Sequence, residues 1–309
     1  MKTDDPITLI YETVHGSRAY GLARDGSDTD IKGVFVGPAA WYLGFTQSPE
    51  QVELSADHVR FEVRKFMRLA AAANPTILEL LFTHPEDHLT VTPAGQRLLD
   101  ARDGFLTKRV ADTFNGYAMG QLKRIKTHRR WLLEPPGKEP LRADFGLPES
   151  TVVPKDQLGA AETLIEKGQL ADADVSGNFL ELLAREKRYK HARQQWEQYR
   201  SWLKHRNPAR AALESKHGYD TKHAMHLVRL QRMAMEILET GEVRVRRPDR
   251  EELLQVRDGA WSYDDLIERS EAMTQRVEEL RGRSALPEDP DYDVLNALCV
   301  EIVEGVLRA

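Results

Sequence analysis

The apolar positions of this chain follow a strand-like pattern near the start and a helical pattern over the rest. Short apolar runs rich in β-branched residues predict strands over residues 7–14, 29–36 and 51–63. Apolar residues at intervals of three and four predict helices over residues 64–81, 98–133, 179–205, 220–240, 250–256, 263–281 and 290–308. Strands followed by helices favour an α+β protein, with a small mixed sheet and a large carboxy-terminal helical domain.

Residues 134–178 interrupt the helical pattern. They contain several prolines and end near a Ser-Gly pair, which is typical of a linker or a mobile substrate flap. We therefore expect a catalytic domain over residues 1–133, this linker or flap over 134–178, and a helical substrate-binding domain over 179–309.

The candidate chemistry lies between the first two predicted strands. If Thr29–Val36 is a strand, the alternation of side chains points Asp28 and Asp30 to the same side. Two neighbouring carboxylates suit a hard cation such as Mg²⁺ beside a triphosphate. Gly16 allows the backbone to approach a phosphate, and Ser17 offers a hydroxyl where a short helix begins. The Asp-x-Asp pair by itself also fits an ordinary solvated turn.

A longer pattern contains these residues. Gly-Ser-x-Ala-x-Gly at residues 16–21, followed by Ser-Asp-x-Asp at 27–30 and an apolar strand, resembles the signature of the DNA polymerase beta nucleotidyltransferase superfamily. The resemblance implies an enzyme that moves a nucleoside monophosphate from an NTP to an acceptor hydroxyl and releases pyrophosphate. It also implies two Mg²⁺ or Mn²⁺ ions and a nucleotidyltransferase-type sheet.

Two residues compete for the third carboxylate of a two-metal site. Strand alternation over residues 51–63 places Glu62 on the polar side. Asp57 instead resembles the family's third acid, because it opens a short apolar strand before a helix. One β-bulge inverts the facing of a strand, so both residues stay candidates.

Looser phrases extend the resemblance to a narrower group, the RNA-ligase-associated nucleotidyltransferases (RlaP). These phrases are Arg64-Lys65-Phe66 with residues 74–82, Gly116-Tyr117-Ala118 with 121–125, and Lys222 with 226–229. The resemblance implies an RNA end as acceptor and a role in repair beside an RNA ligase. Two alternatives are a small-molecule or protein acceptor, and a non-catalytic nucleotide-binding partner protein.

The helix expected near Asp220 carries three donors at intervals of four and three, namely Lys222, His226 and Arg229. This spacing puts them on one face, where the resemblance implies contact with the triphosphate or with nucleic-acid phosphate. A polar helix face is the alternative, and His223 with His226 also has the spacing of a transition-metal pair.

Basic and aromatic residues alternate along 179–205. This combination suits a groove for single-stranded nucleic acid, although the aromatic spacing equally suits packing into a core.

Composition adds two expectations. The net charge of −5 gives no overall attraction to nucleic acid, so binding needs local basic patches. The longest apolar runs fall short of the roughly 18 residues of a membrane span, and the first residues lack the apolar core of a signal peptide. We expect a cytoplasmic protein that does not enter a membrane.

Overall fold

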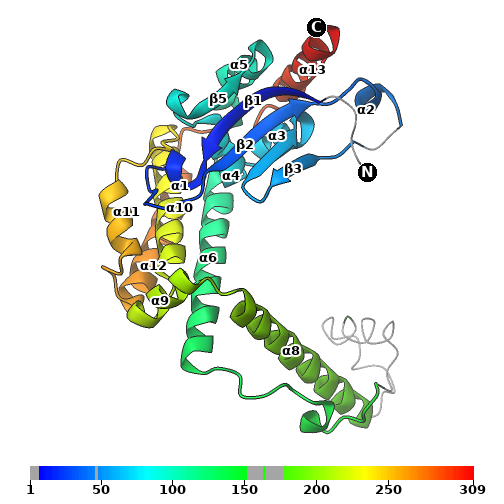
Figure 1. The fold of residues 1–309 in the computed structure, drawn as a ribbon, viewed down its shortest axis with the longest axis vertical. Coiled ribbons are helices and arrows are strands. Elements are labelled where there is room, and N and C mark those ends of the chain that lie inside the picture. Colours follow the sequence, from blue (N-terminus) through cyan, green and yellow to red (C-terminus); the bar gives the residue numbers. More distant parts are fainter. Residues whose placement is uncertain (1–6, 46–47, 152–162, 164–176) are drawn as a thin grey trace. The chain divides into compact units, whose positions relative to one another are not determined.

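The computed structural model describes residues 7–45, 48–151, 163 and 177–309 (Figure 1). The chain divides into two compact units: unit 1 joins Met1–Lys126 with Tyr219–Ala309, and unit 2 is Thr127–Gly218. The expected domain boundaries, after residues 133 and 178, differ from these because the last helices pack on the core of unit 1. Most of the expected linker or flap, at 152–162 and 164–176, lies outside the described residues.

Unit 1 contains a five-stranded mixed sheet in the order β3-β4-β2-β1-β5. The strands are β1 (Thr8–His15), β2 (Asp30–Val36), β3 (Gln51–Ser55), β4 (His58–Glu62) and β5 (His88–Val91). β2 and β4 are parallel, and the other neighbours are antiparallel. The single strand expected over 51–63 is a hairpin instead, because Ala56 and Asp57 form a turn. Together with the helices of unit 1, this sheet confirms the expected α+β class.

Most helices of unit 1 lie close to where the periodicity predicts them. They are α1 (Gly16–Ala19), α2 (Ala40–Leu43), α3 (Val63–Ala71), α4 (Pro75–Leu81), α5 (Pro93–Asp100), α10 (Thr221–Thr240), α11 (Arg250–Arg257), α12 (Tyr263–Arg283) and α13 (Tyr292–Arg308), with 3-10 turns η1 (Pro85–Asp87) and η2 (Arg102–Phe105). Helix α6 (Val110–Leu133) begins in unit 1 and ends in unit 2. Asn74 caps α4 through its side chain and Pro75 occupies the first turn, so the Asn-Pro pair separates two helices.

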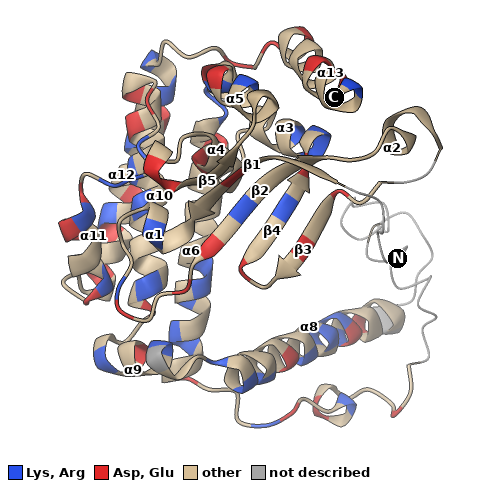
Figure 2. Ribbon diagram, turned by 45° about the horizontal axis from the view of Figure 1, so that its top comes forward, with Lys and Arg blue, Asp and Glu red and all other residues tan. Residues whose placement is uncertain are grey.

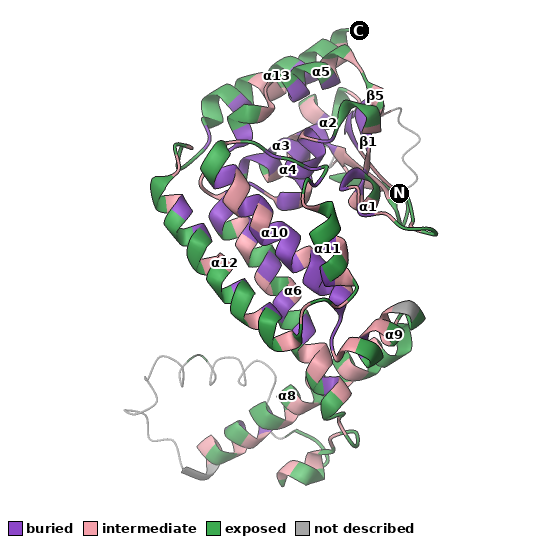
Figure 3. Ribbon diagram, turned by 90° about the vertical axis from the view of Figure 1, so that its left-hand side faces the viewer, coloured by how far each residue is buried: buried purple, intermediate pink, exposed green. Residues whose placement is uncertain are grey.

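The core of unit 1 joins the sheet to α3, α4 and α10. The hydroxyl of Tyr11 on β1 donates a 2.7 Å hydrogen bond to the carbonyl of Leu80 on α4. Buried residues continue along most of α10 (Figure 3), from Thr221 to Leu238. A helix buried over so much of its surface fixes the position of any polar side chain it carries.

Unit 2 contains α8 (Gly177–His205), α9 (Pro208–His217) and the 3-10 turn η3 (Arg142–Phe145). Trp131 at the end of α6 packs against Tyr199 and Trp202 of α8, with ring centroids 5.7 and 5.4 Å away. The guanidinium of Arg206 lies 4.6 Å from the ring centre of Trp202 and pairs with the buried Glu214 at 2.5 Å. The aromatic residues at this end of α8 thus pack within unit 2.

No helix among the described residues is both long enough and apolar enough to cross a membrane.

Candidate active site

The bend after β1 is in direct contact with Asp30. Gly16 turns the chain with a φ of +67°. A Cβ atom built on Gly16 would lie 1.9 Å from Oδ2 of Asp30. Glycine is required here for two reasons, because the positive φ disfavours other residues and because the carboxylate occupies the space of a side chain.

Asp28 and Asp30 occupy different surroundings. Asp30 is the first residue of β2, is half-buried and pairs with His15 of β1. Asp28 lies in the exposed loop before the strand. The strand begins at Asp30, one residue after the expected start at Thr29. Asp28 is therefore outside the strand, and strand alternation does not determine the direction of its side chain. Two residues of chain span at most about 7 Å, so the Cα atoms of Asp28 and Asp30 lie within that distance of each other.

Asp57 lies in the turn that leads into β4, the strand next to β2. The backbone N–H of Ile31 donates a 2.7 Å hydrogen bond to the carbonyl of Asp57. Ile31 pairs with His58 in the parallel β2–β4 ladder, so Asp57 and Asp30 lie at the same end of that pair. Asp57 is exposed in the turn before β4.

Glu62 lies at the opposite end of β4. Five residues of strand, about 16 Å, separate it from Asp57. Its buried carboxylate caps α3 by accepting hydrogen bonds from the backbone N–H groups of Arg64 (3.1 Å) and Lys65 (3.2 Å). The geometry therefore favours Asp57 over Glu62 as the third carboxylate, because Glu62 is used in capping and is remote from Asp30.

A buried polar cluster lies next to the bend and joins α4 and α10 to β1 and to the residue that follows α1. Oε2 of Glu79 on α4 accepts a 2.5 Å hydrogen bond from the hydroxyl of Tyr20 and lies 3.4 Å from Nε2 of His15. Oε1 of Glu79 pairs with the guanidinium of Arg229 on α10. That guanidinium lies 3.9 Å from the ring centre of Tyr20, which follows α1. We call these four residues the Glu79 cluster.

The charges in this cluster determine the protonation states of Glu79 and Tyr20. Burial by itself raises the pKa of a carboxyl group, but the positive charge of Arg229 and the hydrogen bond from His15 lower the pKa of Glu79 to about 2. Burial raises the pKa of Tyr20, and the negative charges of Glu79 and Asp30 raise it further. Asp30 thus lies close enough to act electrostatically on Tyr20. Glu79 is ionised and Tyr20 is neutral at neutral pH.

The three donors expected on α10 differ in exposure. Lys222 and His226 are half-buried, whereas Arg229 is buried and paired with Glu79. The structure therefore does not bring all three to one open surface as their spacing suggested. Arg229 contacts the bend through Tyr20 instead.

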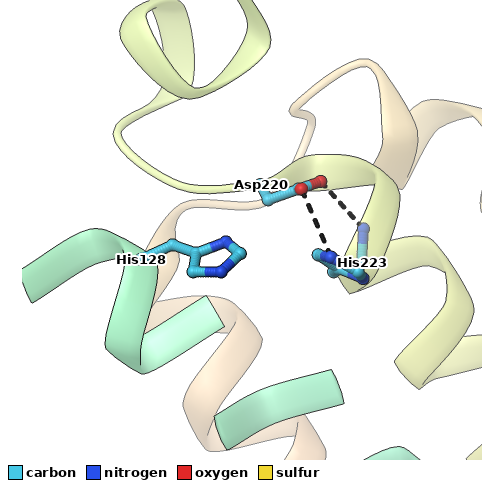
Figure 4. A group of neighbouring side chains, drawn as sticks. All are labelled: His128, Asp220 and His223. Carbon is cyan, nitrogen blue, oxygen red and sulfur yellow. Dashed lines mark hydrogen bonds and ion pairs between the residues drawn. The ribbon is translucent and has the colours of Figure 1, made fainter. Parts of the chain in front are cut away.

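The helix α10 begins as the sequence predicted. The side chain of Asp220 caps it by accepting a 3.0 Å hydrogen bond from the N–H of His223, and the second carboxylate oxygen lies 3.5 Å from the His223 ring (Figure 4). The other ring nitrogen of His223 lies 2.7 Å from the side-chain oxygen of Gln121. His223 therefore has a structural role at the start of α10. His128, which the same figure draws, belongs to unit 2.

The described part of unit 1 holds no three His, Cys, Asp or Glu side chains whose ligand atoms all lie within 4.8 Å of one another. The carboxylate oxygens of Asp28, Asp30 and Asp57 are therefore not all within that distance of one another. Such an arrangement suits Mg²⁺, which usually takes one or two carboxylates and keeps its other positions for water and substrate phosphates.

Sequence reasoning missed His15, Tyr20 and Glu79. One signal was available, because Glu79 interrupts the apolar helical run Ile77–Phe82 and a buried unpaired glutamate is rare. That signal indicates a charged partner without naming it.

Comparison with known proteins gives one family match and one similar protein. Residues 1–132 match the family described as RlaP, the RNA repair pathway DNA polymerase beta family. Over 79 residues the chain is 32% identical to the uncharacterized protein YcgL of Bacillus subtilis (strain 168), a match that covers 24% of this chain and 30% of that protein. No solved structure matches the chain.

Proposed function

We propose that the chain is a metal-dependent nucleotidyltransferase, on the premise of the match of residues 1–132 to the RlaP family. It transfers a nucleoside monophosphate from an NTP to the hydroxyl of an RNA end and releases pyrophosphate, in a repair pathway that includes an RNA ligase. The observation that carries the proposal is the contact of the Asp30 carboxylate with the Gly16 bend, with Asp57 in the turn before the neighbouring strand β4.

The carboxylates fit the metal that the family implies. Asp28, Asp30 and Asp57 offer only oxygen ligands, which Mg²⁺ and Mn²⁺ prefer, and they leave room for phosphate oxygens. Two bound ions supply charge neutralisation to the triphosphate and lower the pKa of the attacking hydroxyl. Glu62 is absent from this ligand set because it caps α3.

The remaining residues bind and orient the nucleotide. The Gly16 bend lets a phosphate approach the backbone, and Ser17 donates from its hydroxyl. Lys222 and His226 of α10 place positive charge and a donor where the leaving pyrophosphate gains negative charge. Arg229 has a positioning role and does not bind the nucleotide itself, because its guanidinium contacts Tyr20 and pairs with Glu79 next to the bend.

The proposal is tested with Asp30→Asn, which keeps the shape of the side chain and removes its charge. Pyrophosphate release is measured with each NTP, Mg²⁺ and a short RNA acceptor. We expect a loss of at least about a hundredfold, since even outer partners of metal ligands are worth about 10–100-fold. Asp25→Asn, an exposed carboxylate in the same loop, is the matched control and keeps the wild-type rate. Wild-type transfer by Asp30→Asn would refute the proposal.

A further inference from the structure

We infer that the exposed face of α8 in unit 2 binds the phosphate backbone of a nucleic-acid strand. This inference rests on the proposed function only for the identity of that strand, the acceptor RNA. The chain is acidic as a whole, with a net charge of −5, yet residues 177–217 carry ten Lys and Arg against four Asp and Glu. Figure 2 shows the basic segments recurring along α8. Positive charge is thus concentrated locally, as polyanion binding by an acidic protein requires.

Four of these cations form a line. Lys190, Arg193, Arg200 and Lys204 are separated by intervals of three, seven and four residues, which places them along one side of an α-helix. All four are exposed. At 1.5 Å per residue they extend over roughly 21 Å of helix. We call them the cationic stripe.

Most of the stripe is available to a ligand. Arg193 pairs with Glu197 at 3.0 Å, one turn further along the helix. Within the described residues, Lys190, Arg200 and Lys204 have no carboxylate within 4.0 Å. Cations that stay unpaired on an exposed helix face lose little by binding phosphate, because no internal ion pair has to break.

The opposite side of α8 is already occupied. Tyr199 and Trp202 pack against Trp131, with ring centroids 5.7 and 5.4 Å away. Trp196 lies between Arg193 and Arg200 in the spacing of the stripe and packs against Tyr199, with ring centroids 5.9 Å apart. This packing turns the stripe outward and uses the aromatic rings that would otherwise stack on bases. We therefore expect contacts to phosphates, which are strongly salt-dependent and tolerant of sequence.

The stripe ends at a hollow. Arg200, Ser201, Leu203, Lys204 and His205 line a shallow, open depression at the last turns of α8. Arg200 and Lys204 are one turn apart there and both border it. A line of cations that leads to such a hollow suits a strand with regularly repeated charge.

The experiment measures binding of a fluorescent single-stranded RNA to the full chain at a series of salt concentrations. In Arg200→Ala/Lys204→Ala we expect weaker binding at low salt. We also expect the slope of log K against log salt to fall by about 1.4, because each neutralised phosphate of a single strand contributes about 0.7. The matched control is Arg283→Ala/Arg308→Ala, which removes two exposed cations of unit 1 and should leave the slope unchanged. An unchanged slope in the stripe variant overturns the inference.

Two further measurements separate this inference from the proposed function. Binding of a non-hydrolysable NTP with Mg²⁺ should be equal in the stripe variant and the wild type, which also shows that the variant is folded. If the wild type releases no pyrophosphate with any RNA but still binds RNA through the stripe, the enzyme proposal fails and this inference stands. If polyglutamate displaces RNA as well as unlabelled RNA of equal charge does, the face is a general polyanion surface and the inference fails.

Discussion

At the scale of single residues, the candidate site depends on a glycine with no space for a side chain. Gly16→Ala adds a methyl group at a φ of +67°, and that methyl would lie 1.9 Å from the Asp30 carboxylate. The backbone conformation alone costs about 1–2 kcal/mol in a residue other than glycine. We expect a free energy of unfolding lowered by at least that amount, and a transfer rate lowered by a hundredfold or more because Asp30 is displaced. Urea unfolding and pyrophosphate release measure the two effects.

Gly26 supplies the control for this change. It has a φ of +77°, but a Cβ atom added there meets nothing within 4 Å. Gly26→Ala therefore imposes backbone strain without displacing a carboxylate. The free energy of unfolding of Gly26→Ala should fall by about 1–2 kcal/mol, while its transfer rate stays unchanged. Equal losses of activity in both variants would show that strain, and not contact with Asp30, explains the effect of Gly16→Ala.

The two candidates for the third carboxylate predict opposite pairs of effects. Asp57→Asn changes an exposed turn residue, so stability should change by no more than about 0.5 kcal/mol. Its transfer rate should fall by at least about a hundredfold, as for any metal ligand. Glu62→Ala removes a helix cap and should cost about 0.5–2 kcal/mol of stability with the rate at saturating Mg²⁺ retained. Thermal unfolding and pyrophosphate release on both variants decide the assignment, and the reverse pattern would return Glu62 to the site.

At the scale of elements, hydrophobic periodicity predicted most helices and strands of the described chain. The signal was strongest in α10, where buried residues recur from Ala224 to Ile237 and Asp220 provides the cap. The prediction over 51–63 was wrong in one respect, because its alternation continues through the turn at Ala56 and Asp57. Period-two alternation shows that a segment is extended but does not show where it reverses direction.

The candidate site was predictable only where its residues are close in sequence. The motif at residues 16–30 placed Gly16 and Asp30 near each other, and the structure has them in contact. The partner of Arg229 was not predictable, because Glu79 is 150 residues away. Helical spacing indicates that Arg229 shares a face with Lys222, but burial on that face depends on which helix packs against it. Such information enters only with tertiary structure.

At the scale of the whole molecule, the Glu79 cluster ties α4 and α10 to the bend after β1. Breaking a buried ion pair by removing one partner costs about 3–5 kcal/mol, since the other charge stays buried without compensation. Arg229→Met alone should therefore be more damaging than the double variant Glu79→Gln/Arg229→Met, in which neither charge remains. These residues come from segments far apart in the chain, so the cluster contributes to the stability of the tertiary fold of unit 1.

The cluster predicts how stability responds to acid. The pKa of Glu79 is about 2 in the folded chain, whereas its ordinary value is 4.5. A carboxyl group whose pKa is lower in the folded chain than in the unfolded chain stabilises the fold. Its full contribution is present above the pKa of the unfolded chain and is lost as the pH falls from about 4.5 towards 2. Within that window the Glu79 carboxyl alone makes the free energy of unfolding decrease by up to about 1.4 kcal/mol per pH unit. In Glu79→Gln/Arg229→Met this decrease should be absent, while other depressed carboxyls such as those of Glu12 and Asp249 titrate in both proteins. Urea unfolding at several values from pH 3 to 7 gives the difference, and parallel curves for the two proteins would mean that Glu79 is not held ionised by Arg229.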